Sequence, residues 1–409
     1  MLNIIWLSFF FIAFLSGLYQ FFMLGNSAIF NDITLATFTL SKTAFEISLG
    51  LTGVLCFWMG IMKIGEKSGF IDLLTNFLSP LLKRLMPDVP DKHPALGAMV
   101  MNLSANMLGL DNAATPLGIK AMQHLQTLNP DKDTASNAQI LFLVINTSAV
   151  TLFPLSIFTY RAQMGAADPT DVFIPILIAT YASTIAGLIA VASVQRIRLY
   201  DPVILSYLAG FSGFIGATLW YFSQLDQAIM QQQSALLSNF IIFSLIILFM
   251  AGALKRRINV YEHFIDGAKE GFSTAVMIIP YLVAMLVAIG VFRASGAMDL
   301  ILQALRSVLQ IFAIDERFVD ALPTAFMKPL SGSGARAMMV ETMQTHGADS
   351  FAGRLASIVQ GSTETTFYVL AVYFGAVGIK NARHALACGL IADLAGIIVA
   401  ILLGYLFFG

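Results

Sequence analysis

The chain has 409 residues, of which 57% are hydrophobic and 11% charged, and its mean hydropathy is +0.79. An average soluble domain carries about 25% charged residues, so this composition predicts an integral membrane protein and excludes an ordinary soluble domain. The formal net charge is −1 and the longest basic run is Lys255-Arg256-Arg257, which excludes a nucleic-acid-binding surface and an acidic tail.

The first apolar stretch, residues 2–24, has no basic segment before it and no small-residue cleavage site. We therefore expect a retained first helix rather than a removed signal peptide. A helix needs about 20 apolar residues to cross a bilayer core, and nine stretches meet that length. They are residues 2–24, 44–62, 138–159, 172–194, 203–222, 238–254, 271–292, 351–375 and 385–408.

Two long regions fit neither a clean span nor a soluble loop. They are residues 65–128 and 294–347, and each begins with an amphipathic helix, expected at residues 70–85 and 297–311. Each then continues into a short apolar piece that a cluster of Asn, Ser, Gly and Pro interrupts. Interrupted apolar segments at matching places in two halves of a chain are typical of transporter binding sites.

Both halves follow the same order, which indicates a duplicated unit. Residues 68–74 align with residues 295–301, and each copy is followed by a polar break, a polar-cored span and a last span with an Ala-Gly step. The predicted fold class is therefore an all-α polytopic membrane protein with two repeats. Convergent hydropathy in two helical bundles is the alternative.

Basic residues in short loops predict the cytoplasmic side of a membrane protein. The clearest groups are Arg196 with Arg198, the run 255–257, and Lys380 with Arg383. These three groups lie on the same, cytoplasmic side of the membrane if the two interrupted regions enter the membrane and return without crossing it. Five spans then separate the starts of the two repeats, so inverted topology is predicted.

The first break, residues 102–116, offers donors and acceptors at membrane depth, where unwound backbone is tolerated only against protein or a water-filled cavity. Its candidate substrate-binding residues are Asn102, Ser104, Asn106, Asp111, Asn112 and Thr115. Pro116 suits the first turn of a following helix, with Asn112 or Thr115 as its cap. A capped loop without a ligand is the alternative.

The second break, residues 328–336, contributes the candidate substrate-binding residues Lys328, Ser331, Ser333 and Arg336. Its glycines are expected to open a helix over residues 335–345, whose free amide groups, with the two cations, would hold an anion or phosphate. The alternative is structural, with Arg336 paired to Glu341 or Glu364.

The two polar-cored spans are expected to supply the opposite wall of the site. Their candidate residues are Asn146 and Ser148 in one span, and Gln360, Ser362, Thr363 and Glu364 in the other. Glu364 and Asp393 are carboxylates deep in apolar spans, where an ionised group costs several kcal/mol unless it is paired or hydrated. Either could carry a coupling proton or sodium ion. Polar packing between helices is the alternative.

Two long motifs carry a family resemblance. Residues 102–118, Asn-Leu-Ser-Ala-Asn-Met-Leu-Gly-Leu-Asp-Asn-Ala-Ala-Thr-Pro-Leu-Gly, resemble the signature of the spore maturation protein A family. Residues 328–336, Lys-Pro-Leu-Ser-Gly-Ser-Gly-Ala-Arg, and 360–368, Gln-Gly-Ser-Thr-Glu-Thr-Thr-Phe-Tyr, resemble spore maturation protein B. The chain looks like a fusion of the two.

The resemblance implies an A-like half at residues 1–200, with a Gate unit at about 44–194, and a B-like half at residues 201–409, with a Gate unit at about 271–408. This nucleoside-recognition group is similar to parts of concentrative nucleoside transporters and of the ferrous-iron transporter membrane domain. It implies a multi-pass protein of the bacterial inner membrane.

We expect a secondary transporter or channel for a small polar solute, nucleoside-like by resemblance, that works by alternating access between two repeats. The alternative is a non-transporting scaffold or regulator of envelope or spore maturation. Ferrous-iron permeation is weaker, because no cysteine lies in the breaks. The five histidines are scattered without zinc spacing, so no enzyme activity, metal or cofactor is expected. Expected partners are lipid, the solute and a sodium ion or proton, and a homo-oligomer is left open.

Overall fold

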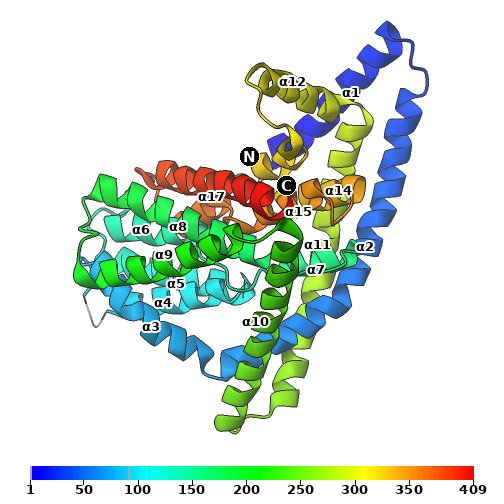
Figure 1. Ribbon diagram of the computed structural model, residues 1–409. Helices are drawn as coiled ribbons and strands as arrows, with labels where there is room; N and C mark the ends of the chain where they lie inside the picture. The colour runs from blue at the N-terminus through cyan, green and yellow to red at the C-terminus, as the bar shows by residue number, and fades with distance from the viewer. Residues whose placement is uncertain (1, 91–92, 110) are drawn as a thin grey trace. The chain divides into compact units, whose positions relative to one another are not determined.

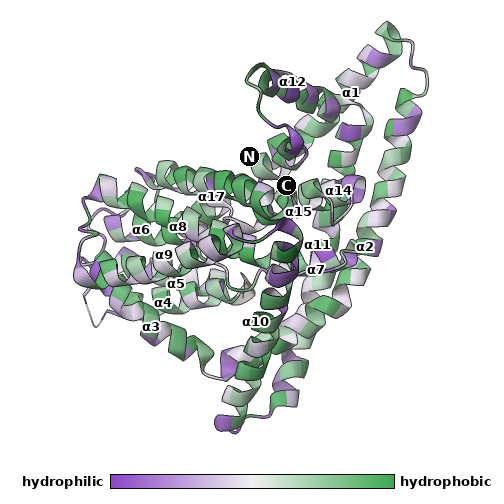
Figure 2. Cartoon of the chain, in the orientation of Figure 1, coloured by the Kyte–Doolittle hydropathy of each residue, from purple (hydrophilic) through white to green (hydrophobic). Residues whose placement is uncertain are grey.

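The computed structural model describes residues 2–90, 93–109 and 111–409, except for the side chains of Leu2 and residues 111–113. Over these residues the chain is helical, without a β-strand and with one isolated bridge between Thr134 and Asn381. The described residues include seven helices long and apolar enough to cross a membrane, and Figure 2 colours the chain by the hydropathy of each residue. They are α1 (Leu2–Met23), α2 (Ile29–Lys67), α8 (Phe173–Gln195), α9 (Pro202–Ser223), α10 (Gln227–Lys255), α11 (Val260–Ala294) and α17 (Ala385–Phe408). The all-α multi-pass fold is confirmed.

Two of the nine predicted spans are each broken into a pair of short helices, so their prediction as continuous spans is wrong. Residues 138–159 hold α6 (Asn137–Thr147) and α7 (Leu155–Gln163), and residues 351–375 hold α15 (Phe351–Gly361) and α16 (Thr366–Gly375). We call the connections the α6–α7 break, residues 148–154, and the α15–α16 break, residues 362–365. Pro154 disfavours helix at the residue before it, and the Ser and Thr side chains of the second break compete for backbone hydrogen bonds.

The two interrupted regions follow the same element order. In the first, α3 (Phe70–Leu85) is followed by α4 (Pro94–Met107) and α5 (Asp111–Leu128). In the second, α12 (Ala297–Ile311) is followed by the 3-10 helix η1 (Arg317–Ala321), by α13 (Leu322–Met327) and by α14 (Gly332–His346). Both amphipathic helices have the predicted bounds, which confirms them.

The starts of α3 and α12 share one local structure. Gly69 and Gly296 precede the helices with φ of 90° and 71°, in the left-handed region that glycine adopts without strain. The preceding serines, Ser68 and Ser295, each donate a hydrogen bond of 2.7 Å to the backbone carbonyl three residues earlier. The weak sequence match between residues 68–74 and 295–301 therefore corresponds to a shared turn.

Contacts divide the chain into two compact units that interleave along the sequence. Unit 1 holds the residues up to Met59, Ser156–Pro169 and Ala268–Gln360, and unit 2 holds Gly60–Leu155, Thr170–Gly267 and Gly361–Gly409. The two short helices of each broken span therefore belong to different units. Helix α7 groups with α12–α15 in unit 1, whereas α16 groups with α3–α6 and α8 in unit 2.

In unit 2, α8 and α17 pack along one another and also contact α6 (Figure 1). Small residues allow this close packing. A Cβ on Gly187 of α8 would lie 3.1 Å from the Cβ of Ala392, and Ser183 Oγ donates to the carbonyl of Ala392 at 2.9 Å. The Ala-Gly steps noted in the sequence thus lie at a helix contact.

Candidate functional site

An amide cluster joins four helices of unit 2. It consists of Asn102 and Asn106 on α4, Asn146 on α6 and Tyr373 on α16. Asn102 Nδ2 donates to Tyr373 Oη at 3.2 Å and to the carbonyl of Ala114 on α5 at 2.7 Å. Tyr373 Oη in turn donates to Asn146 Oδ1 at 3.2 Å, and Asn106 Nδ2 donates to the same oxygen at 2.7 Å. The structure therefore brings together three residues that the sequence placed in the site, and adds a tyrosine.

Two oxygen atoms of this region have no hydrogen-bond partner among the described residues. They are Asn102 Oδ1 and Ser104 Oγ, and both side chains are fully buried. A buried polar atom left without a partner costs about 1–3 kcal/mol, so such atoms usually meet a water or ligand. The α4 helix thus presents unused hydrogen-bonding capacity inside unit 2.

The phenol of Tyr373 is held in a fixed position. Its ring stacks on Phe142 at a centroid distance of 5.9 Å and an interplanar angle of 8°. Gly118 of α5 leaves room for the hydroxyl, because a Cβ there would lie 2.1 Å from Tyr373 Oη. Sequence reasoning missed Tyr373. The only signal for it was a tyrosine in an apolar segment that follows the Gln360–Thr366 motif.

The connection between α4 and α5 lies against the α6–α7 break. Gly109 has φ of 69°, and a Cβ on it would lie 2.3 Å from the carbonyl oxygen of Phe153. Leu152 N donates to the carbonyl of Met107 at 2.7 Å. Only glycine fits this backbone conformation and this close approach.

The prediction for Pro116 is wrong. Helix α5 begins at Asp111, so Pro116 lies beyond its first turn and Thr115, which is half-buried, is not a cap. Residues 111–115 already have helical backbone, so the helix starts earlier than predicted. The side chains of Asp111 and Asn112 lie outside the described part of the structure.

The α15–α16 break binds the end of α6. Glu364 N donates to the carbonyl of Thr147 at 2.7 Å, and Thr363 Oγ1 lies 2.8 Å from the same oxygen. Thr363 Oγ1 also lies 2.5 Å from Oδ1 of Asp393, which is 1% exposed on α17. Thr363 and Asp393 therefore meet, with Ser362 buried beside them.

Glu364 was predicted to lie deep in a continuous span, and this is wrong. The helix breaks around it, and its side chain is exposed, with no ion pair to any described residue. The carboxylate is therefore not buried within the protein.

Ser148 ends α6 and contacts α8. The Ser148 hydroxyl is buried and donates to the carbonyl of Val144 at 2.8 Å, and its own carbonyl accepts from Thr184 Oγ1. Thr184 of α8 and Asp393 of α17 occupy matching places in the two repeats, and each contacts the break of its own repeat. This correspondence supports the duplicated order inferred from the sequence.

The second group of predicted residues lies in unit 1, around the start of α14. Ser331 caps the helix, because its Oγ accepts from Gly334 N at 3.1 Å and lies 3.3 Å from Ser333 Oγ. Arg336 is half-buried and donates from Nε to the carbonyl of Gly332 at 3.3 Å. Lys328 is 3% exposed at the end of α13. The predicted helix over residues 335–345 is present, but it begins earlier than predicted, at Gly332.

Gln360 is the penultimate residue of α15, as Asn146 is of α6. Its side chain is 7% exposed, and Oε1 has no hydrogen-bond partner among the described residues. Both discontinuous pairs therefore place a buried amide next to the break.

Glu341 does not pair with Arg336, the cation that the structural alternative assigned to it. Glu341 forms a two-point ion pair with Arg293 of α11, in which Nη2 and Oε2 lie 2.9 Å apart. Arg293 also lies 3.8 Å from Asp299 of α12. Arg293 reaches Glu341 because α11 and α14 lie in the same unit, whereas Arg336 turns back along its own helix.

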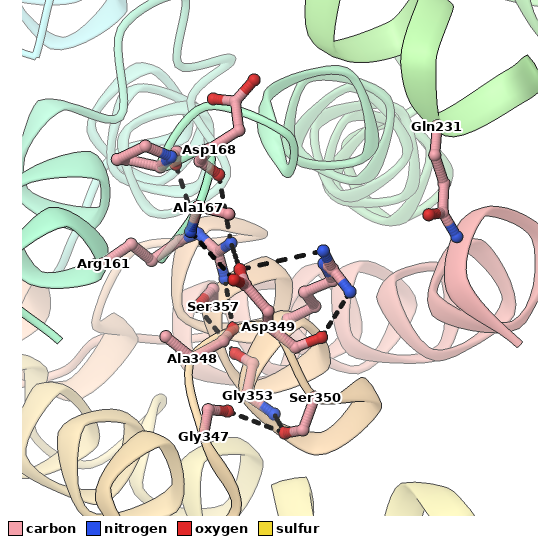
Figure 3. Close-up of polar contacts among 12 residues, drawn as sticks. Arg161, Ala167, Asp168, Gln231, Gly347, Ala348, Asp349, Ser350, Gly353 and Ser357 are labelled. Carbon is pink, nitrogen blue, oxygen red and sulfur yellow. Dashed lines mark hydrogen bonds and ion pairs between the residues drawn. The ribbon is translucent and has the colours of Figure 1, made fainter. Parts of the chain in front are cut away.

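Sequence reasoning also missed Arg161, a fully buried arginine at the end of α7 (Figure 3). Its Nη1 donates to the carbonyl of Ala348 at 2.8 Å, and its Nη2 lies 3.2 Å from Oδ1 of Asp349. Asp349 Oδ2 accepts from Ala167 N at 2.8 Å. The loop after α7 is thereby fixed to the loop between α14 and α15. Arg161 lay just past the end of the predicted span 138–159.

Unit 2 has a matching connection between the loop after α16 and the loop between α5 and α6. Lys380 Nζ lies 3.1 Å from Asp133 Oδ2, and Ala135 N donates to the carbonyl of Asn381 at 3.0 Å. Arg383 Nη1 donates to the carbonyl of Ala135 at 3.0 Å. In unit 1, Arg161 of the short helix α7 thus fixes the loop that follows it. In unit 2, Lys380 and Arg383 fix the loop that follows the short helix α16.

The family whose description is Nucleoside recognition, Gate, matches residues 48–166 and 275–380, which together exceed half of the chain. The chain belongs to the Gate family. One matched segment contains the amide residues of α4 and α6, and the other contains α14 and both sides of the α15–α16 break.

Two relatives from Bacillus subtilis (strain 168) each match about half of this Gate protein. Spore maturation protein A is 42% identical over 189 residues, which cover 46% of this chain and 93% of the relative. Spore maturation protein B is 46% identical over 175 residues, which cover 42% of this chain and 97% of the relative. The matches confirm the resemblance and are consistent with a fusion of the two. No solved structure matches the chain.

Proposed function

We propose that this Gate protein carries a small, polar, nucleoside-like solute across the bacterial inner membrane. The observation that supports the proposal is the unused hydrogen-bonding capacity of Asn102 Oδ1 in the amide cluster and of Ser104 Oγ on the same helix, both buried in unit 2. In a membrane helix such atoms favour a polar ligand over lipid.

The chemistry of the amide cluster fits a neutral ligand with both donors and acceptors. Its side chains are carboxamides and a phenol, which hydrogen-bond without carrying charge. Nucleobase edges carry N–H donors next to carbonyl or ring-nitrogen acceptors, and the family description names nucleoside recognition.

Discontinuous helices support movement of the solute rather than simple storage. Unwound backbone at membrane depth is typical of transporters, where it lines the substrate path. The α6–α7 and α15–α16 breaks would serve this role, and alternating access between inverted repeats remains our prediction for the mechanism.

The first test is a thermal-unfolding screen of the full-length protein in lipid nanodiscs against nucleosides, nucleobases, amino acids and phosphate compounds. A ligand at a hundred times its dissociation constant should stabilise the protein by about 2.7 kcal/mol. Ser104→Ala should fold as well as the wild type, since its hydroxyl has no partner among the described residues, but should lose part of the ligand-induced shift.

Ser234→Ala is the matched control, because Ser234 Oγ is also buried without a partner among the described residues but lies on α10. It should keep the full shift. Uptake of the stabilising compound into proteoliposomes then tests transport, and we expect Glu364→Gln to fold normally but to abolish it. A wild type that binds no compound in the screen would favour a membrane scaffold in envelope or spore maturation.

A further inference from the structure

One face of α17 packs against the α15–α16 break. Gly389, Asp393 and Gly396 are spaced at i, i+4 and i+7, so they share that face. A Cβ on Gly389 would lie 2.7 Å from Thr366 Cγ2, and one on Gly396 would lie 3.0 Å from the carbonyl oxygen of Ser362. The carboxyl group of Asp393 lies between these two close contacts, where it is 1% exposed.

Three oxygen atoms form a chain from α17 to the end of α6. Asp393 Oδ1 lies 2.5 Å from Thr363 Oγ1, and Thr363 Oγ1 lies 2.8 Å from the carbonyl oxygen of Thr147. A carbonyl oxygen only accepts, and a threonine hydroxyl has one proton to donate. Both contacts are therefore full two-centre hydrogen bonds at the same time only if the carboxyl group supplies the second proton; otherwise the single hydroxyl proton is shared between two acceptors.

The electrostatic surroundings also favour a neutral carboxyl group. Helix α17 packs against α6, α8, α10 and α16. These helices and the break contribute few ionisable groups: Tyr181 on α8, Lys255 at the last position of α10, Tyr368 and Tyr373 on α16, and the acid Glu364. An ionised carboxylate buried in a membrane span costs several kcal/mol, and protonation removes that cost.

We propose that Asp393 is a proton-binding site whose occupancy controls the contact between the α15–α16 break and the end of α6. In the protonated state the carboxyl donates to Thr363 and Thr363 donates to Thr147. When the proton leaves to water, the Thr363 hydroxyl turns to the carboxylate, and the carbonyl of Thr147 keeps only the bond from Glu364 N. Coupling of this proton to solute movement rests on the proposed function.

Infrared difference spectroscopy of the full-length protein in nanodiscs tests the protonation directly. The wild-type minus Asp393→Asn spectrum at neutral pH should contain the carbonyl band of a protonated carboxylic acid. Asp226→Asn is the control, because Asp226 is exposed before α10 and its difference spectrum should contain carboxylate bands only. Carboxylate bands alone in the Asp393→Asn spectrum would overturn the proposal.

A second variant keeps the test decisive if Asp393→Asn does not fold. Thr363→Val removes the acceptor and should shift the carboxylic acid band to higher frequency, whereas Thr363→Ser should leave it in place. A Thr363→Val spectrum in which no carboxylic acid band moves would contradict the proposal.

Proteoliposome uptake tests the coupling. For one proton per neutral solute, an inward gradient of about one pH unit concentrates the solute up to about tenfold, since one pH unit is a tenfold difference in proton activity. The Asp393→Asn variant should exchange solute across the membrane, but the proton gradient should not concentrate the solute inside its vesicles. Accumulation driven by the proton gradient in this variant, or accumulation in the wild type that requires only a sodium gradient, would overturn the coupling. A wild type that transports nothing overturns the proposed function, while the infrared result still decides the proton site.

Discussion

The guanidinium group of Arg161 and the carboxylate of Asp349 form an ion pair of 3.2 Å inside unit 1, with the arginine fully buried and the acid partly exposed. Arg161 also donates to the carbonyls of Ala348, Asp168 and Pro169, so its guanidinium group contacts both loops. The pair fixes one half of a discontinuous helix to the unit in which it packs.

Asp349→Ala should therefore destabilise the protein by about 1–3 kcal/mol, the cost of leaving a buried polar group incompletely satisfied. Thermal unfolding of the full-length protein measures this. Asp315→Ala is the control, because its pair with Arg317 is half-exposed and such pairs contribute about 0–1 kcal/mol. Equal losses in the two variants would mean that Arg161 is held by the backbone carbonyls alone.

Gly118→Ala should disturb the amide cluster, because the new methyl group would collide with the Tyr373 hydroxyl. Overpacking of this kind costs about 1–3 kcal/mol. Tyr373→Phe removes the colliding oxygen, so the double variant should lose less stability than the sum of the two single variants. Gly97→Ala, which has open space around its Cβ on α4, should be neutral or slightly stabilising. Additive losses at Gly118 and Tyr373 would contradict the close approach of the phenol to Gly118.

The two halves of the chain should not be stable apart. Each compact unit takes helices from both halves, so residues 1–200 expressed alone would lack α17 beside α8. Coexpression of residues 1–200 and 201–409 as two chains should give a complex that copurifies through a tag on either. Gly187→Leu should weaken that complex, whereas Gly210→Leu, on an open face of α9, should not. A monodisperse, protease-resistant half would contradict this expectation.

Stability should decrease at acidic pH through His384, which precedes α17. Burial and the neighbouring Arg383 lower the pKa of His384 below its ordinary value of 6.5, and the ring lies 3.0 Å from Gln195 Nε2. Below pH 6.5 the unfolded chain binds a proton at this position that the folded protein resists, so stability is lost as the pH decreases. His384→Gln should lose less stability than the wild type between neutral and acidic pH. Parallel thermal-unfolding curves for the two proteins would show that His384 does not contribute.

Local patterns predicted the amphipathic helices α3 and α12 with their bounds, and the body of α14 but not its start at Gly332. Apolar spacing and flanking glycines act within a few residues, so the sequence contains the whole signal for the two amphipathic helices. Asn102, Asn106 and Asn146 could be predicted as one group because amides are rare in apolar spans, and a transporter-like order placed them near each other.

The two broken helices could not be predicted from hydropathy. Residues 138–159 and 351–375 are apolar enough to span, and the loss of helix at each break is compensated by tertiary hydrogen bonds, such as Glu364 N to the carbonyl of Thr147. That bond joins segments more than two hundred residues apart. The partner of Glu341 was missed for the same reason, since Arg293 lies on another helix.

The packing of α8 against α17 also has a consequence for biosynthesis. The ribosome makes everything from α9 to α16 after α8, which takes roughly 10 to 40 s at ordinary elongation rates. Throughout that interval, the face of α8 with Ser183 and Gly187 lacks its contact with α17, although α6 can already pack against it. A chain truncated before α17 would keep this polar, small-residue face open, which makes it the surface that membrane proteases and insertion chaperones would meet first.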